Sequence, residues 1–276
     1  MFGAIVGDMV GSTHEFSRAL VDEKTFPLFT PESRFTDDSV LTLAVARAVM
    51  QGFGDGKATG EACARSMREL GRMFPRAGYG GGFRAWLASE DMGAYGSMGN
   101  GSAMRVSSVG WAYDTLPQVE RYAAITAEVT HNHPEGVRGA KATACAVFMA
   151  RRGAAKDDIR REIESRYGYA LDESLAAIRK RYMARPAVTC QETVPEALTA
   201  FLASENFEDA IRKAVALGGD TDTLAAIAGS VAEAFYGGVP EPLRREALER
   251  LDPRLAAILE TWDAWRETRL ALDADA

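Results

Sequence analysis

The chain has 276 residues, of which 47% are hydrophobic and 26% are charged, values that are ordinary for a globular protein and exclude a disordered or collagen-like chain. With 32 basic against 39 acidic side chains the formal net charge is −7, which argues against nucleic acid as the main partner, because phosphate binding needs a basic surface. No run of about 18 apolar residues occurs, so we expect no membrane span and no membrane partner.

Helical periodicity dominates the sequence from its first residues. The opening run MFGAIVGDMVGS has no basic leader and carries Asp8 among apolar residues, so we do not expect a secretory signal. Glycines recur four residues apart in this run, at Gly3, Gly7 and Gly11. If the run is helical, these glycines form a stripe that another helix can approach closely. We expect such a packing reason, because each glycine inside a helix costs about 1 kcal/mol.

Two later segments predict buried helices. In 39–50 (SVLTLAVARAVM) apolar residues fall at helical spacing and few polar residues interrupt them, a pattern typical of a helix that is buried on all sides. The segment 222–236 (DTLAAIAGSVAEAFY) repeats this pattern and ends at Gly237 and Gly238. Further helices are predicted at about 57–73, 81–89, 117–130, 134–152, 155–167, 171–183, 194–204, 206–217, 241–249 and 253–271.

Strand signals are almost absent, and VTCQET (188–193) is the single weak candidate. We find no linker or repeat, so the sequence predicts one all-α domain over residues 1–276, with a polar stretch at about 151–186 on its outside. Three widely spaced cysteines, an odd number, indicate a reducing cytoplasm rather than a disulfide framework or a zinc site. These are Cys63, Cys145 and Cys190.

Two acidic clusters stand directly before the two buried helices. The first is TDDS (36–39) and the second is GGDTDT (218–223). Taken singly, each cluster is explained by helix capping, because Asp, Ser and Thr accept hydrogen bonds from the first N–H groups of a helix. A cap needs one oxygen, however, and each cluster offers two carboxylates as well as hydroxyl groups.

Taken together, the two clusters predict a cation site. Both are expected near the core, where several carboxylates repel one another and do not all stay ionised without a cation. Carboxylate and hydroxyl oxygens are the ligands that Mg²⁺ prefers. Asp37 and Asp38 point in different directions, so they could serve two metals, or one metal and one substrate hydroxyl. Asp220 lies in the turn and Asp222 at the helix start, where the two can converge, and the paired pattern favours a two-metal site.

The remaining polar segments suit a nucleotide-like ligand. GYGGG (78–82) and GNGSAMR (99–105) expose backbone N–H groups that suit phosphates, although either segment could be an ordinary turn. His131 and His133 match no zinc motif and could instead cap backbone groups. Glu15 belongs either to a mobile loop or to the ordinary surface. No GxSxG motif or nucleophilic triad is visible.

The chain resembles the ADP-ribosylglycohydrolase family, which includes the dinitrogenase-reductase-activating glycohydrolases and the eukaryotic ADP-ribosyl-acceptor hydrolases. The resemblance covers most of residues 1–240, and its specific part is TDD followed later by GGDTDT. No motif matches at about 155–190. The matching segments, in the order typical of the family, are GAIVGDMVGSTHEF (3–16), FTDDS (35–39), GYGGG (78–82), YGSMGNGSAMR (95–105), THNHPEG (130–136) and LGGDTDTLAAIAG (217–229).

This resemblance implies a single compact globule of orthogonal helices with two Mg²⁺ (or Mn²⁺) ions in a central cleft. Glu15 matches a flap glutamate that approaches a metal or leaves it as substrate enters, and Met98 stands where relatives often have an aromatic residue, so it would stack less firmly. The implied metal ligands are Thr36, Asp37, Asp38, Asp220, Asp222 and Thr223. The implied substrate contacts are Gly80, Gly96, Ser97, Met98 and Asn100, around the diphosphate and distal ribose, and His131.

The implied reaction is hydrolysis of an N- or O-glycosidic bond at the anomeric carbon of ADP-ribose. Asp37, Asp38 or Glu15 would deprotonate the attacking water or stabilise oxocarbenium-like charge. The expected partner is an ADP-ribosylated protein or small molecule, and an ADP-ribosylated base stays open as a substrate. Two other functions also stay open: a metal-dependent nucleotide pyrophosphohydrolase, which would release AMP, and a non-catalytic ADP-ribose-binding protein. All four aspartates are present, which favours an enzyme.

Overall fold

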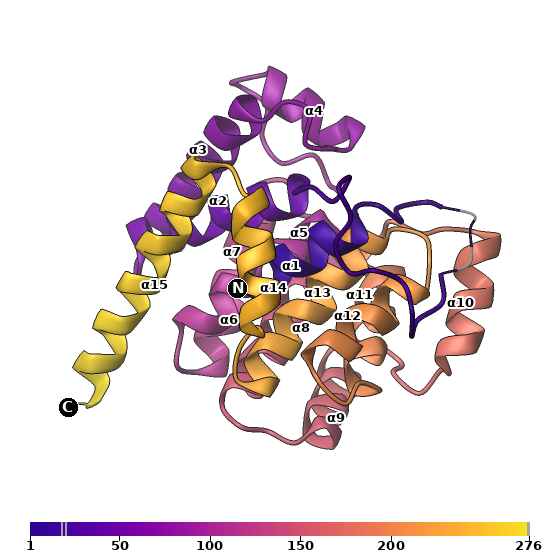
Figure 1. Ribbon diagram of the computed structural model, residues 1–276. Coiled ribbons are helices and arrows are strands. Elements are labelled where there is room, and N and C mark those ends of the chain that lie inside the picture. Colours follow the sequence, from indigo (N-terminus) through magenta and orange to yellow (C-terminus); the bar gives the residue numbers. More distant parts are fainter. Residues whose placement is uncertain (18, 20, 275–276) are drawn as a thin grey trace.

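The computed structural model describes residues 1–17, 19 and 21–274, and within them the regular structure is helical, as predicted (Figure 1). Every helix that the periodicity predicts is present, and two short ones, α5 and α6, are additional. The helices are α1 (Phe2–Gly11), α2 (Asp37–Gly52), α3 (Gly56–Met73), α4 (Gly81–Ala88), α5 (Gly101–Met104), α6 (Ser107–Ala112), α7 (Leu116–Glu128), α8 (Pro134–Arg151), α9 (Lys156–Tyr167), α10 (Leu175–Ala184), α11 (Cys190–Leu202), α12 (Phe207–Ala216), α13 (Thr221–Tyr236), α14 (Glu241–Arg250) and α15 (Pro253–Ala274). None of these helices combines the length and the apolar character that crossing a bilayer requires.

The weak strand candidate at 188–193 does not form a strand. Thr189 forms only an isolated antiparallel bridge with Gly99, and α11 begins at the next residue. The extended backbone here serves two hydrogen bonds: Asn100 N donates to Val188 O at 2.9 Å, and Cys190 N donates to Met98 O at 3.0 Å. Because β-branched residues favour any extended backbone, the sequence pattern does not separate this short link from a strand.

The glycine stripe of α1 packs directly against α13. A Cβ atom at Gly7 would lie 2.0 Å from the carbonyl oxygen of Ala225, and one at Gly3 would lie 2.2 Å from that of Gly229. At the end of the stripe, a Cβ atom at Gly11 would lie 2.4 Å from the carbonyl oxygen of Thr221. The two backbones therefore touch, which is the packing reason that the glycine spacing predicts.

Helix α1 also joins the starts of the two helices that carry the acidic clusters. The Asp8 carboxylate accepts hydrogen bonds from residues at the start of α2, and Thr221 Oγ1, at the start of α13, donates to Gly11 O at 2.8 Å. Both α2 and α13 are largely buried, as their composition predicts. The fold thus brings the N-termini of α2 and α13 together through a third, fully buried helix.

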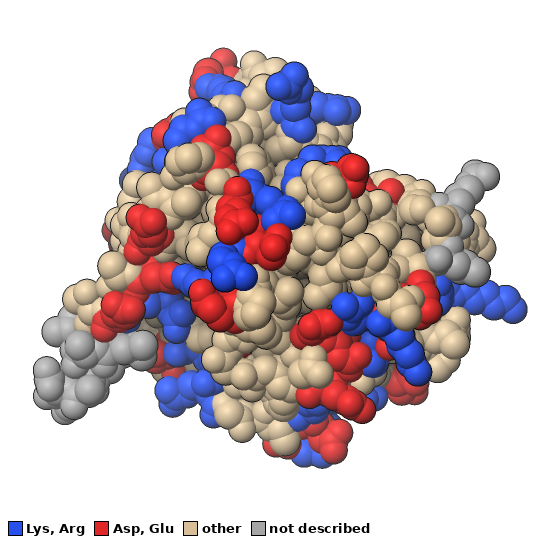
Figure 2. All heavy atoms as spheres, in the orientation of Figure 1, with Lys and Arg blue, Asp and Glu red and all other residues tan. Residues whose placement is uncertain are grey.

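The polar stretch at about 151–186 lies on the outside of the molecule, as predicted. Helix α9 buries only Ile159, Ile163 and Tyr167, and α10 lies at the edge of the molecule (Figure 1). On the face that Figure 2 shows, basic and acidic side chains are interspersed, so this face offers no broad basic patch. The three cysteines are free and buried.

Candidate active site

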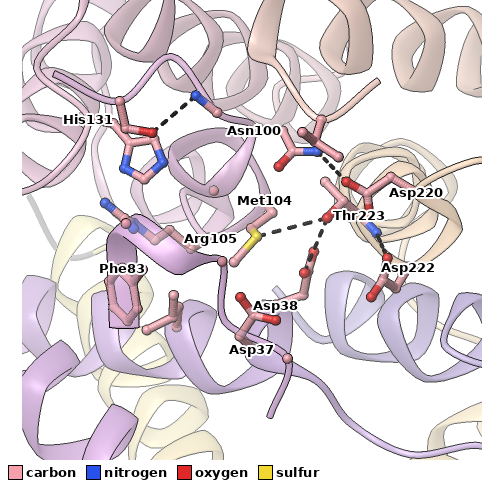
Figure 3. Close-up of a pocket in the computed structure, with 18 of the residues that line it drawn as sticks. Asp37, Asp38, Phe83, Asn100, Met104, Arg105, His131, Asp220, Asp222 and Thr223 are labelled. Carbon is pink, nitrogen blue, oxygen red and sulfur yellow. Dashed lines mark hydrogen bonds between the residues drawn. The ribbon is translucent and has the colours of Figure 1, made fainter. Parts of the chain in front are cut away.

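A pocket of about 340 Å³ opens where the N-termini of α2 and α13 meet (Figure 3). Figure 3 shows carboxylates on one side of it and His131 with Arg105 on the other. Three exposed apolar side chains lie at or beside its mouth: Phe16 and Val188 line the pocket, and Met98 is in the neighbouring loop. Five carboxylates line it, those of Glu15, Asp37, Asp38, Asp220 and Asp222.

The two acidic clusters meet in this pocket although they are far apart in sequence. Thr223 Oγ1, in α13, donates to Asp38 Oδ2, in α2, at 3.2 Å across 185 residues of chain. One carboxylate oxygen from each of Glu15, Asp220 and Asp222 lies within 4.8 Å of the other two. The sequence therefore identified residues that share one site, while their individual roles stay predictions.

Burial and mutual repulsion act strongly on these acids. Desolvation, followed by the charge of Asp222, raises the pKa of Asp37 to about 8 and that of Asp38 well above its usual range. Burial likewise raises the pKa of Asp220 and, more strongly, that of Asp222. Glu15 is solvent-exposed, yet desolvation by the pocket walls and then the charge of Asp222 raise the pKa of its carboxyl to about 7.

The donor set fits a hard cation. Asp38 Oδ1 is buried and has no hydrogen-bond partner in the part of the chain that the structure describes. A buried carboxylate oxygen without a donor is costly. Because the neighbouring acids repel it further, positive charge is what would stabilise it, and clustered carboxylate oxygens are the ligands of Mg²⁺ and similar ions.

Asp8 is a polar residue of this region that the sequence analysis did not assign. Its fully buried carboxylate accepts from Thr36 N at 2.9 Å, from Thr36 Oγ1 at 2.7 Å and from Ser39 N at 3.1 Å, and the Ser39 hydroxyl donates to it as well. Asp8 thereby holds the first turn of α2 in place behind the pocket. The signal that could have found it is a carboxylate inside an apolar, glycine-striped helix, because a buried carboxylate needs donors.

Thr36 lies behind the pocket rather than in its lining. Its hydroxyl donates to Asp8 and its oxygen accepts from Asp38 N at 3.3 Å, so it caps α2. The capping interpretation therefore holds for Thr36. Asp38 also belongs to the first turn of α2, but its carboxylate faces the pocket.

The predicted substrate contacts divide into two groups. Gly80, Ser97, Asn100 and His131 line the pocket. Gly96 and Met98 do not line it, although both belong to the loop that does.

Hydrogen bonds show how this loop is held. Gly96 N donates to Asn132 Oδ1 at 2.7 Å, and Gly96 has a φ of 67°, which favours glycine. Asn100 Nδ2 donates to Asp220 Oδ2 at 2.6 Å and to Thr193 Oγ1 at 3.2 Å. The loop is therefore tied directly to the acidic cluster.

Glycine at two further positions leaves room for site side chains. At Gly78, where φ is 116°, a Cβ atom would lie 2.9 Å from Asp37 Oδ1. At Gly101, a Cβ atom would lie 3.0 Å from His131 Nε2. The glycine loops thus allow the backbone to pass close to Asp37 and His131.

The two histidines of THNHP have different places. His131 is buried in the pocket wall, and burial, followed by the charge of Arg105, lowers its pKa well below the usual value. His133 Nδ1 accepts from Glu135 N at 3.1 Å and caps α8, which is the alternative that the sequence analysis left open. Phe83, Tyr95 and Arg105 also line the pocket, and no sequence pattern marks them, because only the tertiary fold places them there.

Comparisons with protein-family models, curated proteins and solved structures all lead to proteins named for the hydrolysis of ADP-ribosyl bonds. The family model described as ADP-ribosylglycohydrolase matches residues 1–271. ADP-ribosylhydrolase ARH3 from Bos taurus is 28% identical over 313 residues, covering 87% of this chain and 85% of that protein. ADP-ribosylarginine hydrolase Tri1 from Pseudomonas putida (strain GB-1) is 29% identical over 264 residues, covering 87% of this chain and 71% of that protein. A solved structure described as an ADP-ribosylglycohydrolase-related protein complex is 26% identical, with a TM-score of 0.61, covering 96% of this chain and 93% of that one.

Proposed function

Because the chain belongs to the ADP-ribosylglycohydrolase family and is therefore a hydrolase of ADP-ribosyl bonds, we propose that the pocket between α2 and α13 is its active site and holds two Mg²⁺ ions. The observation that carries this proposal is the meeting of four aspartates in one pocket, with Asp38 Oδ1 buried and lacking a donor among the described residues.

The proposed ligands are Asp37, Asp38, Asp220, Asp222, Thr223 and Thr36. Thr36 lies behind the pocket lining; its hydroxyl hydrogen is directed to Asp8 and its oxygen accepts from Asp38 N, which leaves one lone pair that could face a cation. Glu15 lies with Asp220 and Asp222 and is proposed to act at the pocket mouth. When bound, the cations supply positive charge that holds ribose hydroxyls and makes water a better nucleophile.

The reaction then needs a proton acceptor and an oriented sugar. Water attacks the anomeric carbon, the bond from that carbon to the acceptor breaks, and the acceptor leaves with a proton. Glu15, Asp37 and Asp38 are the carboxylates proposed to take the proton from water or to stabilise charge on the sugar. Gly80, Ser97, Asn100 and His131, with Gly96 and Met98 beside them, are proposed to bind the diphosphate and the distal ribose.

The acceptor is proposed to be a protein side chain or a small molecule. The two named relatives differ on this point, since one is an ADP-ribosylarginine hydrolase and the other is named only as an ADP-ribosylhydrolase. The net charge of −7 disfavours a nucleic-acid acceptor electrostatically.

A panel assay tests the proposal. The purified chain is incubated with Mg²⁺ and proteins or small molecules that are ADP-ribosylated at arginine, at serine or at an O-acetyl group, and the products are separated. We expect intact ADP-ribose from at least one substrate and no product in excess chelator. Release of AMP would instead support a pyrophosphohydrolase. Tight binding of ADP-ribose without turnover of any substrate would support a non-catalytic binder.

A further inference from the structure

A hydrogen-bonded chain of three side chains runs along the pocket wall opposite the carboxylates, and two of its members, Arg105 and His131, line the pocket. Arg105 Nη2 donates to Thr130 Oγ1 at 2.9 Å, and Thr130 Oγ1 lies 2.7 Å from His131 Nδ1. Arg105 is 1% exposed, Thr130 is 0% exposed and His131 is 5% exposed. Figure 3 shows Arg105 and His131 as neighbours on this wall.

The chemistry of the three groups fixes the direction of both hydrogen bonds. A guanidinium has no acceptor, so Thr130 Oγ1 must accept from Arg105. The threonine hydroxyl then has one hydrogen to donate, and among the described residues His131 Nδ1 is the acceptor within reach. If Nδ1 carried a hydrogen instead, the buried hydroxyl would be left without an acceptor, which is costly.

The other ring nitrogen of His131 faces the pocket loop. A Cβ atom at Gly101 would lie 3.0 Å from Nε2, and one at Gly99 would lie 3.6 Å from it. Both glycines line the pocket. A hydrogen on Nε2 is therefore directed at the part of the pocket where the absence of side chains leaves space for a ligand oxygen.

The surroundings also keep the ring neutral. In the described part of the chain Arg105 forms no ion pair with an acid, although the charge of Asp37 acts on it, and its own positive charge acts on the His131 ring. Buried charge of the same sign disfavours an imidazolium. The lowered pKa of His131, caused by burial and then by Arg105, agrees with this geometry.

We propose that Arg105 and Thr130 are positioning residues that hold His131 as the neutral imidazole with its hydrogen on Nε2, so that the pocket wall presents one fixed N–H donor to an oxygen of the ADP-ribosyl group. The donor function rests on the proposed active site, whereas the tautomer is a property of the free protein. The tautomer and the donor function can therefore be disproved independently of each other.

Nitrogen NMR of the free, ¹⁵N-labelled protein tests the tautomer directly. The chain has three histidines, and a His131→Gln variant identifies the signals of His131. At neutral pH we expect a single tautomer, with the hydrogen on Nε2 and with Nδ1 shifted as a hydrogen-bond acceptor. A hydrogen on Nδ1, or signals averaged between two tautomers, would overturn the proposal without any reference to activity.

Substitutions at position 130 test the relay, with a matched control. Thr130→Val removes the hydroxyl and is expected to abolish the hydrogen-bond shift of Nδ1, whereas Thr130→Ser keeps it. Thr126→Val is the control, because its equally buried hydroxyl donates to Ala123 O and not to His131. Unchanged His131 signals in Thr130→Val would contradict the relay. If Thr130→Val does not fold, the spectra of the wild type and of Thr130→Ser still show whether Nδ1 of His131 accepts a hydrogen bond, and an Nδ1 signal without that shift would contradict the relay.

Kinetics then test the donor function. For Thr130→Val we expect kcat/KM to fall by about threefold to tenfold, mainly through KM, because one hydrogen bond to the substrate is weakened. Thr130→Ser and Thr126→Val should stay close to the wild type. Loss of the fixed tautomer with no change in kcat/KM would show that His131 does not bind substrate through Nε2.

Discussion

At the scale of single residues, the acids in and behind the pocket differ in how many hydrogen bonds their carboxylate oxygens accept from the protein. Asp8 has several donors and is a structural support. Asp38 has one hydroxyl donor on Oδ2 and none on Oδ1 within the described residues. This difference separates an acid whose hydrogen bonds the fold supplies from one that we propose as a cation ligand.

Replacing the two acids of α2 should remove activity and leave the fold. With Asp37→Asn and Asp38→Asn together, we expect turnover to fall by more than about 100-fold, since even residues that only support metal ligands often cost 10- to 100-fold. The circular dichroism of the helices should not change. Asp172→Asn, at an exposed site, is the control and should be fully active. Wild-type turnover in the double variant would rule out the proposed metal site.

Glu196 predicts a pH dependence of stability. Its carboxyl is 7% exposed, accepts from Arg181 through Oε1 at 2.9 Å and has no partner on Oε2 among the described residues. Burial raises its pKa from 4.5 to about 7, so the folded state binds more protons than the unfolded state between these values. The stabilisation of the folded state that comes from protonated Glu196 is thus fully present below about pH 4.5. It is lost as the pH rises through 7, and the free energy of unfolding falls by up to about 3 kcal/mol.

Urea unfolding at pH 5 and pH 8 in saturating Mg²⁺ measures this contribution. The stability of Glu196→Gln relative to the wild type should increase with pH, because the neutral amide avoids the buried charge. Glu173→Gln is the control, since Glu173 also binds Arg181 but is 42% exposed. Equal pH dependence in the wild type and in Glu196→Gln would contradict the assignment.

At the scale of elements, the contact between α1 and α13 determines where the second acidic cluster lies. Gly7 leaves no room for even one carbon atom, because the atom it would meet is a backbone oxygen that cannot move without its helix. The distance between α1 and α13 therefore depends on the glycine stripe of α1.

Gly7→Ala should separate α1 from α13. We expect the free energy of unfolding to fall by about 3 kcal/mol or more, as is typical of severe overpacking. Gly60→Ala in α3 is the matched control: its Cβ would lie 3.5 Å from Ile125 Cγ2, an ordinary contact, so it should stabilise the protein by about 0.5–1 kcal/mol. Denaturant unfolding measures both, and similar values for the two variants would disprove the role of the stripe.

The long helices α2 and α13 were predicted well from the sequence, because both are largely buried and their apolar composition is visible without a structure. The convergence of Asp38 and Asp222 was predictable, since acids before buried helices need compensation. The roles of Asp8 and Arg105 were not, because their partners Thr36 and Thr130 are distant in sequence and the pairing exists only in the fold. Residues 188–193 were a weak strand candidate for a different reason: their β-branched residues suit an extended backbone, but only one isolated bridge, to Gly99, forms there.

At the scale of the whole molecule, a cation that binds only the folded protein stabilises all of it. With Mg²⁺ at 100 times its dissociation constant, we expect about 2.7 kcal/mol per site and a higher Tm. The same ionic strength supplied as NaCl should have much less effect. Thermal unfolding of the Asp37→Asn, Asp38→Asn variant should respond weakly to Mg²⁺. An equal response of both proteins would place the bound cation elsewhere.

The exposed side chains of Phe16, Met98 and Val188 have a practical consequence for redesign. They come from three separate loops, whereas the four aspartates lie at the starts of α2 and α13, which the buried helix α1 joins. Mutant libraries that vary these three exposed positions would therefore change the surface around the pocket while leaving the buried helical core untouched, which makes them the place to begin a search for altered substrate selectivity.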